Sequence, residues 1–112
     1  MASHRSVTLL LALALTGCIA EEMSSQPCPP GGTTLTYENF GRDFFSSHCV
    51  HCHGGPNGYS SRAFTTVESI RAQADRIYVN SARSNDAMPP GPSDISTEDR
   101  DRLGLWLTCG AP

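Results

Sequence analysis

The first hydrophobic pattern of the chain is an unbroken apolar run close to its start. Residues 7–15 are apolar except for one threonine, and His4 and Arg5 precede them. Nine residues are too few to cross a hydrocarbon core of about 30 Å, which needs about 20 residues in a helix. A short apolar run behind a basic start is typical of a secretory signal, so we expect the mature chain to be exported.

The next hydrophobic pattern predicts a helix over residues 37–47. Thr36 is suited to cap its N-terminus, and Glu38 in the first turn suits the helix dipole. Four aromatic residues at helical spacing fall on one face, which we expect to be buried. They are Tyr37, Phe40, Phe44 and Phe45.

Two further stretches carry apolar residues at helical spacing. One begins near Thr65 or Thr66 and repeats at intervals of three, four and three, which predicts one helix. Its apolar residues are Val67, Ile70, Ala74 and Ile77. The other begins at Ser96 and is stopped by Gly110. Its buried stripe is Leu103, Trp106 and Leu107.

The segments between these helices are loops. Residues 53–58 are rich in glycine, and residues 87–92 contain three prolines that forbid a helix. Little strand pattern is present, so the fold class is all-α, with about three helices.

Composition divides the chain into three parts. Residues 1–17 form the signal peptide, and residues 18–32 form a flexible tether rich in Glu, Ser, Gln and Pro. Residues 33–112 form the folded unit. A unit of this size has a marginal core, which a buried cofactor or a disulfide would reinforce.

The charge of the chain excludes one class of partner. It has 8 basic residues, all of them arginine, against 11 acidic ones. Removal of residues 1–17 takes away Arg5, and seven minus eleven leaves a net charge of −4. Nucleic acids bind to basic surfaces, so no nucleic-acid partner is expected.

Residues 15–18, Leu-Thr-Gly-Cys, resemble the end of a bacterial lipoprotein signal. The resemblance implies cleavage before Cys18 and a lipid on its sulfur, which would anchor the chain to a membrane. The alternative is ordinary cleavage after Ala20; both place the chain in the bacterial periplasm. Ile19, rather than an aspartate, follows the cysteine, which favours the outer membrane.

The run Cys49-Val50-His51-Cys52-His53 carries the most specific chemistry of the chain. Two cysteines three positions apart, followed by histidine, are typical of a c-type haem attachment site. Each sulfur would bind the haem covalently, and His53 would ligate the iron. A redox dithiol and an exported zinc or structural module are the alternatives.

The remaining cysteines are a candidate disulfide pair. When Cys18 is assigned to lipid, and Cys49 and Cys52 to haem, Cys28 and Cys109 remain. An oxidising compartment would allow them to pair, and the alternative is two free thiols.

With these features in this order, the chain resembles a class I cytochrome c over residues 36–109. Gly41 and Phe45 precede the haem motif at the spacing that this family uses where its first and last helices cross. Leu103 and Trp106 match the family's apolar-x-x-aromatic partner on the last helix. The resemblance implies a small domain around one haem c, serving as an electron carrier between redox partner proteins rather than as an enzyme.

The resemblance also implies the second axial ligand. Met88, followed by Pro89 and Pro90, matches the family's methionine-proline motif. Methionine and histidine together fill the iron's coordination and raise its reduction potential. If Met88 is not bound, the alternative is a haem sensor or a peroxidase-like unit with an open distal site.

Two supporting roles complete the expected site. Family members commonly bond the second ring nitrogen of the axial histidine to a carbonyl just before a proline, which here would be that of Gly55. Four arginines in the middle of the chain are candidates to pair with the haem propionates. They are Arg62, Arg71, Arg76 and Arg83.

Overall fold

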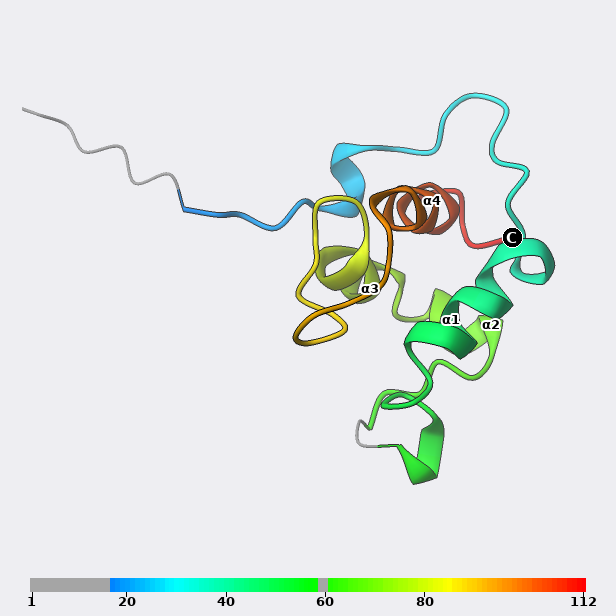
Figure 1. The fold of residues 1–112 in the computed structure, drawn as a ribbon. Coiled ribbons are helices and arrows are strands. Elements are labelled where there is room, and N and C mark those ends of the chain that lie inside the picture. The colour runs from blue at the N-terminus through cyan, green and yellow to red at the C-terminus, as the bar shows by residue number, and fades with distance from the viewer. Residues whose placement is uncertain (1–16, 59–60) are drawn as a thin grey trace, which may run out of the picture.

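The computed structural model describes residues 17–58 and 61–112. Within them the chain is helical and has no strand, which confirms the all-α prediction (Figure 1). The four α-helices are α1 (Arg42–His48), α2 (Val67–Arg71), α3 (Ala74–Ser81) and α4 (Thr97–Thr108). Three short helical turns accompany them: η1 (Met23–Ser25), η2 (Tyr37–Gly41) and η3 (Gly55–Asn57).

The first predicted helix corresponds to η2 followed directly by α1. Thr36 caps it as expected: its hydroxyl accepts from the Asn39 N–H at 3.1 Å, and the Asn39 side chain accepts from the Thr36 N–H at 2.7 Å. The first turn is a wider π-turn, in which the Gly41 N–H reaches the Thr36 carbonyl at 3.1 Å. The extent of the helix was therefore predictable, but the width of its first turn was not.

The second predicted helix is wrong in its continuity, because α2 and α3 are separated at Ala72 and Gln73. The Gln73 N–H bonds the Ile70 carbonyl at 3.0 Å and so tightens the last turn of α2. The Gln73 side chain then donates to the Ser69 carbonyl at 3.3 Å. Ile70 and Ile77 are buried on either side of this break, so the apolar spacing continues although the helix does not.

The last helix begins and ends where the sequence predicts. The Ser96 hydroxyl accepts from the Asp99 N–H at 3.0 Å, and Gly110 follows α4 with a φ of +90°. A glycine adopts this left-handed conformation without steric cost, which is why it ends the helix. The chain then turns back, and the Tyr37 N–H bonds the Pro112 carbonyl at 2.6 Å.

The centre of the core is the contact between η2–α1 and α4. A Cβ atom on Gly41 would lie 2.7 Å from two ring carbons of Trp106, so only glycine allows this approach. The rings of Phe40 and Phe45 pack against Trp106 with centroids 6.0 and 6.1 Å away. Trp106 is completely buried. The helix crossing implied by the family resemblance is therefore present.

The segment expected to be a flexible tether, residues 18–32, is instead attached to the helical unit at Glu21, Met23 and Cys28. Figure 1 shows it, blue to cyan, running past α3 and α4 before it reaches α1. The Glu21 N–H donates to the Asn85 side chain at 2.9 Å, and the Glu21 carboxylate accepts from Tyr78 and Ser84. Met23 packs against the core. Composition missed this because a few polar contacts and one methionine hold the segment.

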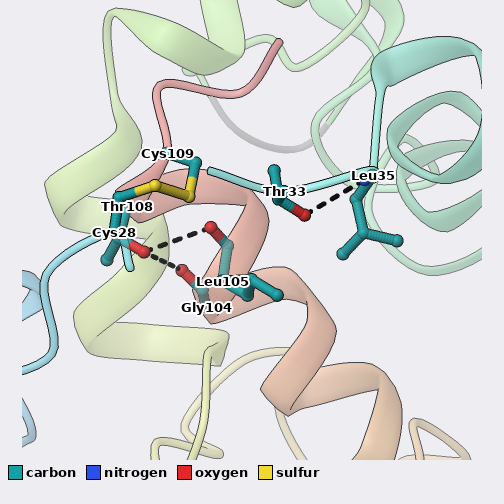
Figure 2. The surroundings of a disulfide bond; sticks show 7 residues. All are labelled: Cys28, Thr33, Leu35, Gly104, Leu105, Thr108 and Cys109. Atoms are coloured by element: carbon teal, nitrogen blue, oxygen red, sulfur yellow. Dashed lines mark hydrogen bonds between the residues drawn. A yellow bond between two sulfur atoms is a disulfide. The ribbon is translucent and has the colours of Figure 1, made fainter. Parts of the chain in front are cut away.

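A disulfide fastens the same segment to the end of α4. Cys28 and Cys109 are bridged, with Cα atoms 4.8 Å apart and a sequence separation of 81 (Figure 2). In the last turn of α4 the Thr108 hydroxyl lies within hydrogen-bonding distance of the Gly104 and Leu105 carbonyls. The bridge closes almost the whole helical unit into one loop.

Candidate functional site

The cysteine pair and its histidine follow α1 in one tight turn of chain. The Cys52 and His53 N–H groups both donate to the Cys49 carbonyl, at 3.2 and 2.9 Å. A Cβ atom on Gly54 would lie 2.5 Å from the Val50 carbonyl oxygen, so the turn can close only over a glycine. These bonds bring both sulfur atoms and the imidazole to one side of the chain.

The two thiols and the imidazole open onto one apolar cavity. Aromatic and aliphatic side chains from α1, α3 and the segment before α4 supply most of its walls, together with Met88 and two prolines. The apolar lining is Phe44, Phe45, Phe64, Ile77, Pro89, Pro90 and Ile95. Two thiols, an imidazole and a thioether around one apolar space fit the donor set of a covalently attached haem.

His53 is oriented by two contacts from the same stretch of chain. Its Nδ1 lies 2.7 Å from the Arg62 carbonyl oxygen, and its ring stacks on Phe64 with centroids 4.3 Å apart. Because a carbonyl oxygen only accepts, Nδ1 carries the proton and Nε2 keeps a lone pair for a metal. The Phe64 N–H donates to the His53 carbonyl at 2.9 Å and fixes this return of the chain.

The expected partner of His53, the Gly55 carbonyl, is therefore wrong. That carbonyl accepts the Gly58 N–H at 2.9 Å and closes the η3 turn. The partner is a carbonyl seven residues further along, and only the folded loop brings it near. We call residues 49–58 and 61–64 the attachment wall.

The Cys49 thiol is partly buried in this wall. Burial raises its pKa to about 12, and the positive charge of Arg100 acts in the opposite direction. Before any covalent attachment it is therefore a neutral thiol at physiological pH. Neither Cys49 nor Cys52 is bridged to another cysteine.

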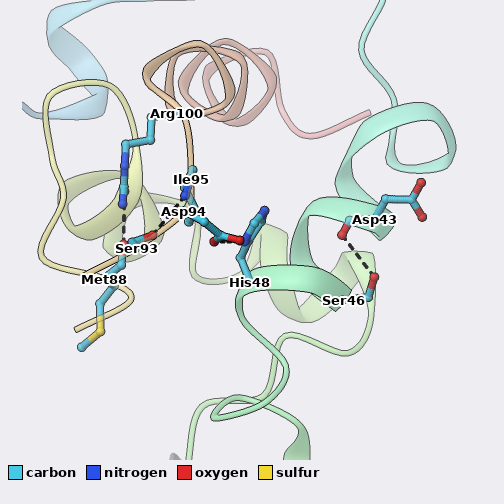
Figure 3. Close-up of polar contacts among 8 residues, drawn as sticks. All are labelled: Asp43, Ser46, His48, Met88, Ser93, Asp94, Ile95 and Arg100. Atoms are coloured by element: carbon cyan, nitrogen blue, oxygen red, sulfur yellow. Dashed lines mark hydrogen bonds and ion pairs between the residues drawn. The ribbon is translucent and has the colours of Figure 1, made fainter. Parts of the chain in front are cut away.

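Met88 reaches the same cavity from the loop between α3 and α4. Its N–H donates to the Asn80 carbonyl at 2.8 Å, and its carbonyl accepts from Arg100 at 3.2 Å. Figure 3 shows its side chain extending from the loop on the side away from Arg100. It is 42% exposed and borders the cavity. We call residues 80–90 the methionine wall.

Other expected residues take separate places. Arg62 and Arg76 line the cavity, whereas Arg71 donates to the Ala111 carbonyl and Arg83 lies over Gly104. His48 also lines the cavity and faces Asp94 at 3.4 Å (Figure 3).

Arg100 is a site residue that the sequence interpretation missed. It is 6% exposed and lies on the buried side of α4 with Leu103 and Leu107. The sequence contains a signal for it, because Arg100, Leu103 and Leu107 follow helical spacing. An arginine therefore occupies a position at which the buried face of the helix would be expected to carry an apolar residue.

The zinc alternative requires a cluster of ligands. Among the described residues, no group of three or more His, Cys, Asp or Glu side chains is arranged to hold a metal ion.

The membrane features lie at the edge of the described chain. Residues 7–15 of the expected signal lie outside it, and Cys18 is exposed. None of the helices in residues 17–58 and 61–112 is both long enough and apolar enough to cross a bilayer.

Comparison with known proteins identifies one relationship. Residues 39–107 match the family model described as Cytochrome C oxidase, cbb3-type, subunit III. This range contains the attachment wall, the methionine wall and most of α4. No curated protein and no solved structure matches the chain.

Proposed function

We propose, because this chain belongs to the family of cytochrome C oxidase, cbb3-type, subunit III, that it carries single electrons through one haem c. The family implies the covalent haem. Our assignment is that Cys49 and Cys52 hold it through thioethers, while His53 and Met88 ligate the iron. The observation that carries this assignment is that all four side chains line one apolar cavity.

The ligand pair determines what the site does. When bound, haem iron supplies one-electron oxidation and reduction. Ligation of the iron by both His53 and Met88 would leave no coordination position for a substrate, which suits electron transfer rather than catalysis. The Arg62 carbonyl, by holding the Nδ1 proton, presents Nε2 of His53 in the form that binds a metal.

The walls of the cavity favour a high reduction potential. Phe45, Phe64 and Ile77 are buried around the site and exclude water. A dry, apolar surrounding disfavours the additional positive charge of oxidised iron, and a methionine ligand acts in the same direction.

We place the protein in the bacterial periplasm, attached to a membrane through a lipid on Cys18. The support is the apolar run of residues 7–15, the Leu-Thr-Gly-Cys sequence, and the exposure of Cys18. The description of the matching family names a cytochrome c oxidase, so such an oxidase is the first redox partner to test.

The cofactor assignment is tested on protein made in a host with haem-attachment machinery. We expect the mature polypeptide to gain the mass of one haem and to stain for haem on a denaturing gel. Replacing both cysteines, Cys49→Ser with Cys52→Ser, should abolish the stain, whereas Cys28→Ser with Cys109→Ser should keep it. A colourless wild-type protein would contradict the proposal.

The second candidate function is a haem unit with an open distal site. The position of Met88 favours it, because a ligand carried by the irregular loop between α3 and α4 is displaced more easily than one carried by a helix. Carbon monoxide distinguishes the two: the reduced wild-type protein should bind it poorly if Met88 is bound, and readily if the site is open.

A further inference from the structure

Arg100 is a buried cation whose partners in the described chain are main-chain carbonyls. Its Nη1 donates to the carbonyls of Ser81 at 2.8 Å, Asn85 at 3.2 Å and Met88 at 3.2 Å. These three oxygens belong to one stretch of eight residues that leaves α3 and ends at Met88. Nη1 carries two hydrogens, so at least one of them is shared between two carbonyls, and the permanent charge of the guanidinium strengthens these bonds.

A buried guanidinium at this position costs more free energy than an apolar side chain would. Burying a charge costs free energy unless strong hydrogen bonds replace its hydration, and an apolar side chain would pack on the α4 stripe without that cost. The charge-assisted bonds to the three carbonyls offset the cost only while the chain from Ser81 to Met88 keeps its present path. The interaction is therefore reciprocal: the segment stabilises Arg100, and Arg100 defines the segment.

Asn85, in the middle of this segment, is bonded to Glu21 and to the Tyr78 carbonyl, but fewer bonds define the chain close to Met88. Beyond Arg83, which has a φ of +58°, the chain is irregular. The Met88 N–H bonds the Asn80 carbonyl, but the Met88 side chain is 42% exposed. Figure 3 shows Arg100 reaching from α4 to the main chain of Met88 while the sulfur extends to the opposite side. Arg100 thus acts on the position of the sulfur through the backbone.

We propose that Arg100 is a positioning residue that holds the Met88 thioether at the cavity and so keeps the distal side of the iron closed. The inference rests on the proposed ligation by Met88. Arg100 is not itself a ligand, and its effect is exerted entirely through the main chain between Ser81 and Met88.

The test compares Arg100→Gln with the matched variant Arg102→Gln, which removes a half-exposed arginine from the same helix. The measurement is a titration of the oxidised holoprotein with imidazole, which competes with methionine for the iron, together with the methionine–iron absorption band. Arg100→Gln should weaken the band and raise imidazole affinity about tenfold, the scale of one charged hydrogen bond. Arg102→Gln should change neither. Unchanged imidazole affinity in a folded Arg100→Gln protein would overturn the proposal.

If Arg100→Gln does not fold, Arg100→Lys tests the positioning role of Arg100 instead. It preserves the charge and most of the stem but not the planar fork. Imidazole affinity should rise about threefold, which is between the wild type and the loss of the charged bond. A wild-type affinity in this variant would contradict the inference.

Met88→Ala separates failure of the inference from failure of the proposed function. If Met88→Ala leaves the absorption band intact, Met88 is not the ligand and the proposed ligation fails. If Met88→Ala removes the band but neither Arg100 variant changes imidazole affinity, only the role of Arg100 fails.

Discussion

The two walls of the cavity are held in different ways. In the attachment wall, the thiols, His53, the Arg62 carbonyl and Phe64 lie within 16 residues. His53 contacts the Arg62 carbonyl and Phe64 directly, and main-chain bonds link it and Cys52 to the Cys49 carbonyl. In the methionine wall, Met88 depends on Asn80 behind it and on Arg100 of α4. One wall is local in sequence, and the other is assembled from distant segments.

This difference teaches where the site is robust. The attachment wall brings its ligand groups together through short loops, which cost little entropy to close. The methionine wall exists only when α3, α4 and the N-terminal segment are packed, because Asn85 links Glu21 to the same stretch that Arg100 binds. We therefore expect perturbations of the tertiary structure to release Met88 before they disturb His53.

The largest expected effect comes from removing the remote cross-link. Cys28→Ser with Cys109→Ser opens a loop of 81 residues and should lower the free energy of unfolding of the holoprotein by about 4 kcal/mol. Denaturant unfolding measures it. In this variant the methionine–iron band should be lost at a lower denaturant concentration than the one at which His53 leaves the iron. Loss of both at one concentration would break the proposed contrast between the walls.

Removing the methionine itself comes next. Met88→Ala should leave the haem attached but increase carbon monoxide affinity of the reduced protein on the order of 100-fold, or about 2.7 kcal/mol. Met23→Ala is the matched control, since Met23 packs on the core away from the cavity lining. Equal carbon monoxide affinities in wild type and Met88→Ala would mean that the distal side is already open.

A smaller effect is expected within the attachment wall. Gly54→Ala places a Cβ atom 2.5 Å from the Val50 carbonyl oxygen and should cost about 2 kcal/mol of stability. Gly55→Ala meets no atom within 4 Å but has a φ of +82°, which costs about 1 kcal/mol. Thermal unfolding of both variants compares close contact with backbone strain. A larger loss for Gly55→Ala would show that the turn relaxes around Gly54.

The smallest effect is a pH dependence in the support of the methionine wall. Tyr78 is completely buried, and desolvation raises its pKa above the usual value near 10. Its hydroxyl donates to the Glu21 carboxylate at 3.2 Å. Because the folded state favours the neutral phenol, Tyr78 makes its full contribution to the free energy of unfolding below pH 10. That contribution is lost as the pH rises through the higher pKa of the folded state.

Tyr78→Phe is therefore expected to cost about 1 kcal/mol at neutral pH and to reduce the loss of stability above pH 10. Denaturant unfolding at several pH values measures both, with Tyr37→Phe as the control. If the free energy of unfolding of Tyr78→Phe falls above pH 10 as steeply as that of the wild type, another group causes the loss of stability at alkaline pH.

Much of the fold was predictable from local rules. Thr36 and Ser96 cap their helices, and Gly110 ends the last one. Each of these depends on residues close in sequence, whereas the approach of Gly41 to Trp106 was implied by the family resemblance. The break at Gln73 was not predictable in this way, since the buried spacing of Ile70 and Ile77 continues across it.

What the sequence determined by itself is the chemistry of the attachment wall. The order Cys-x-x-Cys-His, within one turn of chain, is sufficient to place two thiols and an imidazole together. What only the tertiary structure decided is how those groups are held and how Met88 is placed at the same cavity. The Arg62 carbonyl beside His53 is set by the folding of one local loop, nine residues along the chain. The docking of Glu21 on Asn85 and the bonds from Arg100 to the Met88 segment join separate elements that spacing does not relate. Such contacts follow from the packing of whole helices, because long-range hydrogen bonds form only where burial has already brought their partners together.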